Sequence, residues 1–171
     1  MAAVLPPMVE VSPRTERSLA HTSWDAESST LLCEMDYPDP QPPRSPIDVA
    51  LRIPVPRQRL TLNDLDLLVQ DRRWVDLSLH GSPGDWVPTP LPPLVAVDAA
   101  WIVFQVEYDG NGIASFDLPW RLCWDPSHRT LGIVFAERPV ARWVAVADTV
   151  LAAVDSTSRL GQLRLTGVEL P

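Results

Sequence analysis

Lysine is absent from this 171-residue chain, and its 14 basic residues are therefore all arginines. Asparagine is also rare, at Asn63 and Asn111 only, so the composition is typical of a GC-rich genome that avoids lysine codons. A second interpretation is selection against lysine modification, since arginine keeps the charge without the reactive amine. The chain carries 22 acidic residues and a net charge of −8. This balance argues against a nucleic-acid binder, which must neutralise phosphates, and against docking on anionic lipid.

Long apolar runs and a secretory signal are also missing. The longest apolar stretch, residues 94–104, is interrupted by Asp98 and falls far short of the roughly 20 residues that a membrane helix needs. The start of the chain has no basic region, and Pro6 and Pro7 interrupt its apolar residues. There are only two cysteines, at 33 and 123. We therefore expect a cytoplasmic protein with both thiols reduced and no contact with a membrane.

The motifs of cofactor and metal sites are absent as well. No glycine-rich phosphate loop or dinucleotide fingerprint occurs. His21, His80 and His128, together with the two distant cysteines, do not have the spacing of a structural zinc site. No repeat is evident at the periods typical of solenoids. The sequence therefore predicts neither a cofactor nor a metal.

Proline divides the chain into two parts. Residues 1–46 contain 8 of the 19 prolines, and the segment 36–46 predicts an extended connector because proline lacks the N–H and fixes φ. Residues 30–35 have the composition of a short strand that could pair with the main sheet. We expect a proline-rich N-terminal extension over 1–46, contributing this one strand, and a folded domain over 47–171.

Hydrophobic periodicity within the domain predicts strands and two helices. Alternation predicts strands at 47–55 and 74–80, while Thr61 as N-cap and an apolar stripe predict a helix over 61–73. A second helix is expected over 139–154, because Pro139 suits the first helical position and apolar residues recur at helical spacing. A closing strand is predicted at 163–170.

Two turns complete the prediction. The turns 109–112 and 125–129 predict hairpins that join strands at 101–108 and 113–118, and at 120–124 and 131–136, as a four-strand meander. The expected fold is α+β: an antiparallel or mixed sheet of about six to seven strands with two helices packed on one face.

No catalytic signature emerges from the reactive side chains. Asp76, Ser78 and His80 lie on one strand face, but same-face neighbours are roughly 6.5–7 Å apart along a strand, too far for a hydrogen-bonded relay. Cys123 and His128 flank one predicted turn and could form a thiol–imidazole pair. The stronger interpretation of Cys123 is a small residue on a sheet face, so we assign no catalytic residue.

Loop aromatics and prolines are the better candidates for contacts with another molecule. Trp86 and Trp24 stand in predicted loops beside acidic residues. A loop tryptophan is either a lid over the sheet or an anchor for a partner, and aromatic anchors dominate the energetics of interfaces. Proline-rich segments at 38–46 and 88–93 can act as docking ligands, or simply stiffen long connections. The predicted partner-binding residues are Trp86, Trp24, Pro90, Pro92 and Asp85.

Two functional hypotheses follow. The favoured one is a non-enzymatic protein-binding module, an accessory subunit or immunity-type inhibitor in a bacterial complex or defence system, whose acidity suits a basic protein partner. The alternative is a small enzyme or ligand-binding domain with a pocket between the meander and the helices, using Cys123, His128 and Tyr108. The sequence leaves the oligomeric state open.

Overall fold

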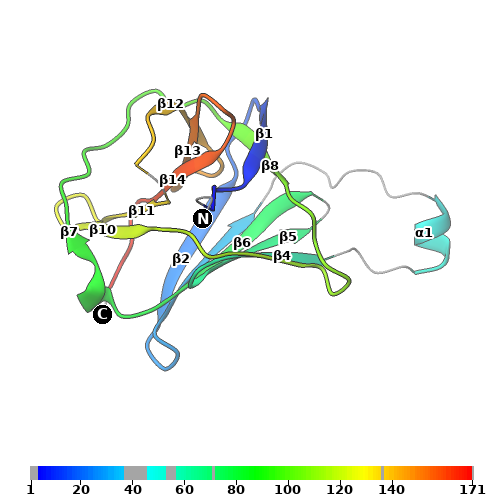
Figure 1. Ribbon diagram of the computed structural model, residues 1–171, viewed down its shortest axis with the longest axis horizontal. Coiled ribbons are helices and arrows are strands. Elements are labelled where there is room, and N and C mark those ends of the chain that lie inside the picture. The colour runs from blue at the N-terminus through cyan, green and yellow to red at the C-terminus, as the bar shows by residue number, and fades with distance from the viewer. Residues whose placement is uncertain (1–3, 37–45, 53–56, 71, 136, 171) are drawn as a thin grey trace.

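The protein is built almost entirely of β-strands. The computed structural model describes residues 4–36, 46–52, 57–70, 72–135 and 137–170. It contains 14 strands, the short helix α1 (Pro46–Ala50) and one 3-10 turn, η1 (Pro83–Asp85). The predicted α+β class is therefore wrong: in the described residues no helix packs on a sheet, and two large sheets enclose the core instead (Figure 1).

The first sheet has six strands in the order β2-β3-β6-β5-β4-β9. Its five sequential strands pair antiparallel, and β9 adds to β4 in parallel. The strands are β2 (Leu19–Asp25), β3 (Thr30–Asp36), β4 (Arg57–Leu62), β5 (Leu65–Gln70), β6 (Arg73–His80) and β9 (Ile113–Phe116).

The second sheet also has six strands, in the order β12-β13-β14-β11-β10-β7, and β7 adds to β10 in parallel. A separate antiparallel pair joins β1 to β8. The strands are β7 (Val87–Pro88), β10 (Arg121–Asp125), β11 (Thr130–Val134), β12 (Val140–Ala145), β13 (Val150–Asp155) and β14 (Leu160–Leu165), with β1 (Met8–Pro13) and β8 (Ala100–Gln105) in the pair.

The two large sheets repeat one topology. In each, a hairpin is followed by a three-strand meander whose last strand pairs with the second strand of the hairpin, giving β2-β3-β6-β5-β4 and β10-β11-β14-β13-β12. The register is also equivalent, because Leu31 pairs with Leu79 in the first sheet and Leu131 with Leu165 in the second. The fold is therefore an internal duplication at a spacing far longer than solenoid repeats.

The hairpin turns of the two halves share sequence as well as geometry. Trp-Asp at 24–25 recurs at 124–125, and Thr-Leu at 30–31 recurs at 130–131. In each turn the aspartate accepts a hydrogen bond from the backbone N–H two residues later, and the threonine hydroxyl donates to the carbonyl two residues earlier. The side chain three residues after the aspartate also bonds it, and that residue is Ser28 in one half and His128 in the other.

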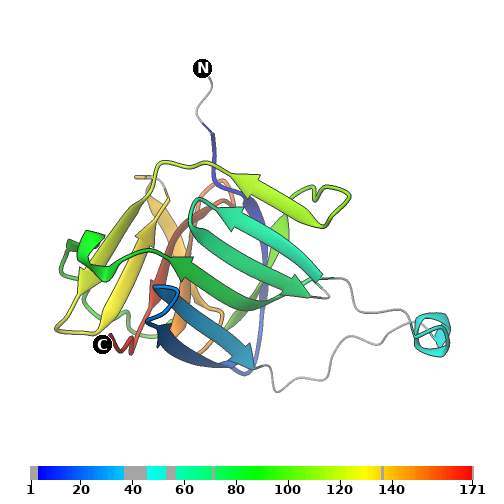
Figure 2. The same cartoon turned by 90° about the horizontal axis from the view of Figure 1, so that it is seen from below.

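A single core lies between the inner faces of the two sheets. Leu31, Leu67 and Leu77 from the first sheet are fully buried, as are Leu131 and Leu163 from the second. Removing this apolar surface from water is the main driving force for folding. Figures 1 and 2 show the two sheets meeting along this core, with α1 standing apart from them.

The helix predicted over 61–73 is instead the β4–β5 hairpin and the start of β6. Its leucines alternate, so that Leu60, Leu62, Leu65 and Leu67 all point into the core. Asn63 adopts φ of 55°, a left-handed conformation that asparagine tolerates, and this reverses the chain between the two strands.

The helix predicted over 139–154 is the β12–β13 hairpin. Every residue of β13 is buried, on both faces of the sheet, so its apolar residues are not confined to one face. A continuous apolar run of this kind does not distinguish a doubly buried strand from a helix, and β-branched valines favour the strand. The strand predicted at 47–55 is also wrong where it is described, because α1 occupies Pro46–Ala50; residues 53–56 lie outside the described residues.

The predicted meander is correct in one of its hairpins. β10 and β11 pair across the turn 125–129 as expected. The turn 109–112 also forms, with Gly112 N–H donating to the Asp109 carbonyl at 2.9 Å. The strands on either side of it do not pair with each other, however, because β8 pairs with β1 and β9 with β4.

The N-terminal residues are part of the sheets. The predicted strand at 30–35 is confirmed as β3, which pairs with both β2 and β6, and β1 pairs with β8. The predicted connector lies mostly outside the described residues, which omit 37–45. Among the helices that the structure describes, none has the length and apolar character needed to cross a membrane.

Candidate protein-binding surface

A proline-rich segment, residues 88–98, crosses the outer face of the second sheet. We call this segment the strap. Leu91 at its centre is buried, and its side chain lies 3.0 Å from where a Cβ on Gly132 would stand. The missing side chain at Gly132 therefore lets Leu91 pack directly on the sheet. The first sheet has no equivalent covering among the described residues, so the strap distinguishes the two halves.

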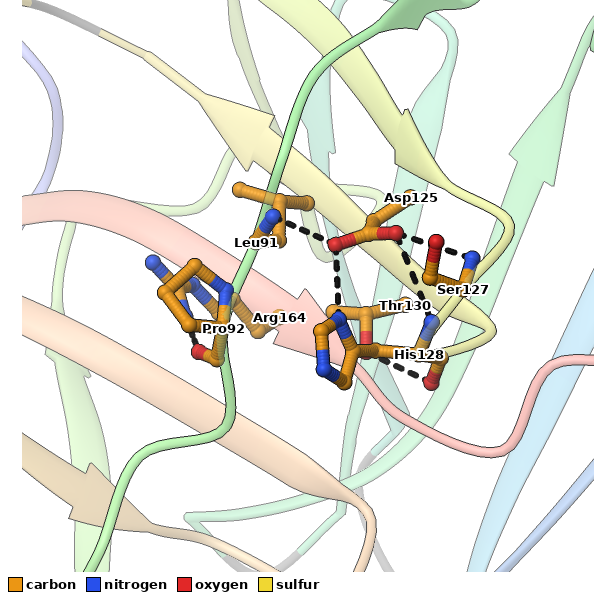
Figure 3. Close-up of polar contacts among 7 residues, drawn as sticks. All are labelled: Leu91, Pro92, Asp125, Ser127, His128, Thr130 and Arg164. Carbon is orange, nitrogen blue, oxygen red and sulfur yellow. Dashed lines mark hydrogen bonds and ion pairs between the residues drawn. The ribbon is translucent and has the colours of Figure 1, made fainter.

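Five polar contacts hold the strap along its length, and the first is the Thr89 N–H donating to the Trp124 carbonyl at 2.9 Å. The Leu91 N–H donates to Asp125 Oδ2 at 2.6 Å, and Arg164 Nη1 donates to the Pro92 carbonyl at 2.9 Å (Figure 3). Further along, the Arg17 guanidinium donates to the Val97 carbonyl, and the Ala145 N–H donates to the Asp98 carbonyl at 2.8 Å. Because prolines fix φ, such a tethered segment has little conformational freedom left to lose.

Asp125 is the central anchor, and it lies at the end of β10. Its Oδ2 accepts from both Leu91 N–H and His128 Nδ1, the latter at 2.9 Å, while Oδ1 accepts from the backbone of Ser127. The hydrogen bond from Leu91, followed by that from His128, holds the pKa of the Asp125 carboxyl far below its usual range. Because these bonds favour the ionised form, Asp125 is an acceptor and Nδ1 of His128 carries the hydrogen.

His128 turns its second ring nitrogen away from Asp125 (Figure 3). The imidazole lines a pocket of about 320 Å³ together with Thr130, Asp148 and Arg17. Cys123, its predicted partner, is only 1% exposed, and the structure pairs His128 with Asp125 instead. The two segments that were expected to form helices beside a catalytic pocket are β-hairpins instead.

Exposed apolar side chains follow the strap on its solvent side. Val95 is 89% exposed and Val87, just before the strap, is 48% exposed. Four prolines between them are also exposed. We call this set the ridge: Val87, Pro88, Pro90, Pro92, Pro93 and Val95.

The predicted partner-binding residues divide between this surface and the core. Asp85, Pro90 and Pro92 are exposed on one continuous loop. Trp86 is only 5% exposed, because its ring lies between Trp24, at 6.4 Å, and Trp124, at 5.8 Å. Trp86 therefore fixes the loop to the body of the protein, and Trp24 covers it as a half-buried neighbour.

Sequence reasoning missed Asp125 and Arg164 as anchors and the two valines of the ridge. The repeated Trp-Asp and Thr-Leu pairs could have identified Asp125, since they mark equivalent turns one hundred positions apart. Arg164 and the valines carried no signal, because their roles depend on which sheet the strap crosses.

The outer face of the first sheet carries the predicted trio of Asp76, Ser78 and His80. His80 Nδ1 lies 3.0 Å from Thr30 Oγ1, and its Nε2 lies 3.7 Å from Asp66 Oδ2, so the imidazole contacts neighbouring strands. Glu34 stands directly opposite Asp76 in the β3–β6 register. Burial first, and then the charge of Glu34, raise the pKa of Asp76 above its usual range.

Asp76→Asn is expected to increase the free energy of unfolding at pH 7 by about 0.5 kcal/mol, since it removes a like-charge cross-strand pair that solvent partly screens. Because the folded-state pKa is raised, the penalty exists when Asp76 is ionised and fades as the pH falls through the carboxyl range. Urea unfolding at pH 7 and pH 4 measures the difference. Glu34→Gln should give a similar gain, and a double variant with fully additive gains would contradict the pairing.

The comparisons with known proteins identify no relative. No family model matches the chain, and no curated protein is significantly similar to it. Among the described residues, no group of three or more histidine, cysteine, aspartate or glutamate side chains is placed to hold a metal ion.

Proposed function

We propose that this chain is a non-enzymatic protein-binding module, an accessory subunit or immunity-type inhibitor of a bacterial complex, and that the ridge contacts its partner. The observation that carries the proposal is an exposed row of apolar residues whose backbone is anchored by Asp125 and Arg164 on the opposite side. Exposed apolar rows of this kind mark interaction sites, and anchoring reduces the entropy lost on binding.

The partner that fits is a protein with an apolar groove bordered by basic residues. The ridge supplies prolines and valines for the groove, and the exposed Asp85 beside it supplies negative charge. The net charge of −8 would steer a basic partner, so association should slow as salt is added. A cytoplasmic location belongs to the same proposal and agrees with two free cysteines, Cys33 and Cys123.

Val95→Asp is expected to weaken partner capture at least tenfold, because a carboxylate placed inside the apolar part of the groove loses its hydration. The measurement is affinity capture from the native host with tagged full-length protein, followed by mass spectrometry and titration of the captured partner. The stability of the variant should stay near that of wild type, since Val95 is 89% exposed.

Val4→Asp serves as the matched control, because Val4 is 50% exposed and lies outside the ridge. It should capture the same partner with wild-type affinity. Equal capture by wild type and Val95→Asp would refute the ridge as the contact surface. Failure of the wild-type chain to retain any protein specifically would refute the binding function itself.

A further inference from the structure

An arginine-lined cleft opens where the β1–β2 connection, the end of the strap and β12 come together. The bridge between Ala99 and Ala145 brings the strap's end against β12, and the β1–β8 pair lies at the same end of the molecule (Figure 1). The cleft has a volume of about 470 Å³, within the range of small-molecule sites. It is separate from the ridge, which lies on the exposed side of the strap.

Three arginines face this cleft, against one carboxylate. Arg14, Arg17 and Arg142 line it, and Asp98 is the acidic residue among its lining side chains. Such a local excess of positive charge stands out in a protein whose net charge is −8, and it indicates a site for an anion. A concave site with charge of one sign concentrates ligands of the opposite sign.

Two of the arginines are held in place and the third is available. Arg14 stacks 3.7 Å above the Trp101 ring and donates from Nη1 to Ser18 Oγ at 2.7 Å. Arg17 is tied to the Val97 carbonyl. Arg142 is exposed and has no hydrogen-bond or ion-pair partner among the described residues. The cleft therefore combines a fixed positive wall with a guanidinium that has unused donors.

Apolar side chains line part of the remaining wall, beside Thr15. Trp143 lines the cleft and is half-buried, with the Arg164 guanidinium 4.8 Å from its ring centroid. Val11, which is half-buried, adds aliphatic surface beside it. A ring or hydrocarbon body could contact this wall while an anionic group reaches the arginines.

We propose that the cleft binds a small organic phosphate, with its phosphate between Arg142 and Arg17 and its apolar body against Trp143. A guanidinium group binds either a carboxylate or a phosphate through paired hydrogen bonds, but a phosphate dianion has the charge and the oxygens to engage two guanidinium groups at once. A long polyanion such as nucleic acid is disfavoured, because the overall negative charge of the protein would repel its remaining phosphates.

Phenyl phosphate is the probe for this proposal, measured by isothermal titration calorimetry with the full-length protein at low salt. We expect saturable binding of one equivalent, at least tenfold tighter than inorganic phosphate, because the ring adds contact with Trp143. Phenol should not bind measurably under the same conditions. Arg142→Gln should weaken phenyl phosphate binding about tenfold or more through loss of a charge-assisted hydrogen bond.

Arg129→Gln provides the matched control, because Arg129 is exposed, pairs with Glu169 and lies outside the cleft. It removes the same charge from the protein and should leave the affinity unchanged. Absence of saturable binding would overturn the proposal. Equal weakening by Arg142→Gln and Arg129→Gln would overturn it too, since that result describes a general charge effect instead of a site.

Discussion

Trp86→Ala is expected to lower the free energy of unfolding by about 4 kcal/mol, the cost typical of removing a large aromatic side chain from a packed core. Trp86 is 5% exposed and packs edge to face against Trp24 and at a tilt against Trp124. These two rings belong to the equivalent hairpins of the two halves. The cavity left by the substitution would therefore loosen the packing of both hairpins. Urea unfolding monitored by circular dichroism gives the change.

Val87→Ala is the control for this experiment, because Val87 is the next residue in the chain and is exposed. Its effect should stay within about 0.5 kcal/mol. A similarly small effect of Trp86→Ala would contradict the core position of the ring. Such a result would instead favour Trp86 as a surface residue that contacts a partner, which is one of the two roles that its place in a proline-rich loop allows.

Local patterns predicted both turns and one strand correctly, although the same alternation at 47–55 predicted a strand where α1 forms. The turn 125–129 joins the strands expected on either side of it, and β6 matches the strand predicted at 74–80. The turn 109–112 shows the limit of local reasoning. It forms as predicted, yet β8 and β9 pair with strands more than fifty residues earlier in the chain, which no turn residue encodes.

The two helices were predicted for a physical reason that the fold overrides. Leu65, Leu68 and Val69 fit a helical stripe, but Leu65, Leu67 and Val69 fit a strand face equally well. In such short segments the tertiary partner decides, because a strand gains its hydrogen bonds only when a neighbour is present. The pairing of β5 with β6 and β4 supplies that neighbour.

The loop that carries the candidate surface was predicted from sequence, whereas its contact with a partner stays a prediction. Asp85, Pro90 and Pro92 were assigned to one exposed loop from their composition, and the structure places all three there. The sequence left Trp86 as either a lid over the sheet or an anchor for a partner, because the choice depends on two rings contributed by residues about sixty and forty positions away. The anchoring of the strap by Asp125 likewise requires knowing which sheet the strap crosses.

Asp125→Ala is expected to lower the melting temperature by roughly 10 °C, because it removes the acceptor of the Leu91 N–H on the strap and of the His128 imidazole in the turn. Asp25→Ala is the matched control. Asp25 occupies the equivalent turn of the first half, but its side-chain bonds are confined to that turn, at Glu27 and Ser28. Asp25→Ala should therefore lower the melting temperature by a third of that amount or less, as measured by thermal unfolding.

The free energy of unfolding, measured as the pH is lowered, separates the effect of the charge on Asp125 from its role in packing. A carboxyl whose pKa is lowered on folding stabilises the protein above its ordinary pKa of about 4, and this contribution is lost as the pH falls through the folded-state value. The pKa of Asp125 is lowered chiefly by the Leu91 hydrogen bond, so the gap in stability between wild type and Asp125→Ala should narrow steadily below about pH 4. A gap that stayed constant between pH 7 and pH 2 would mean that the ionised carboxylate does not hold the strap. The rigidity on which the proposed contact surface depends would then need a different source.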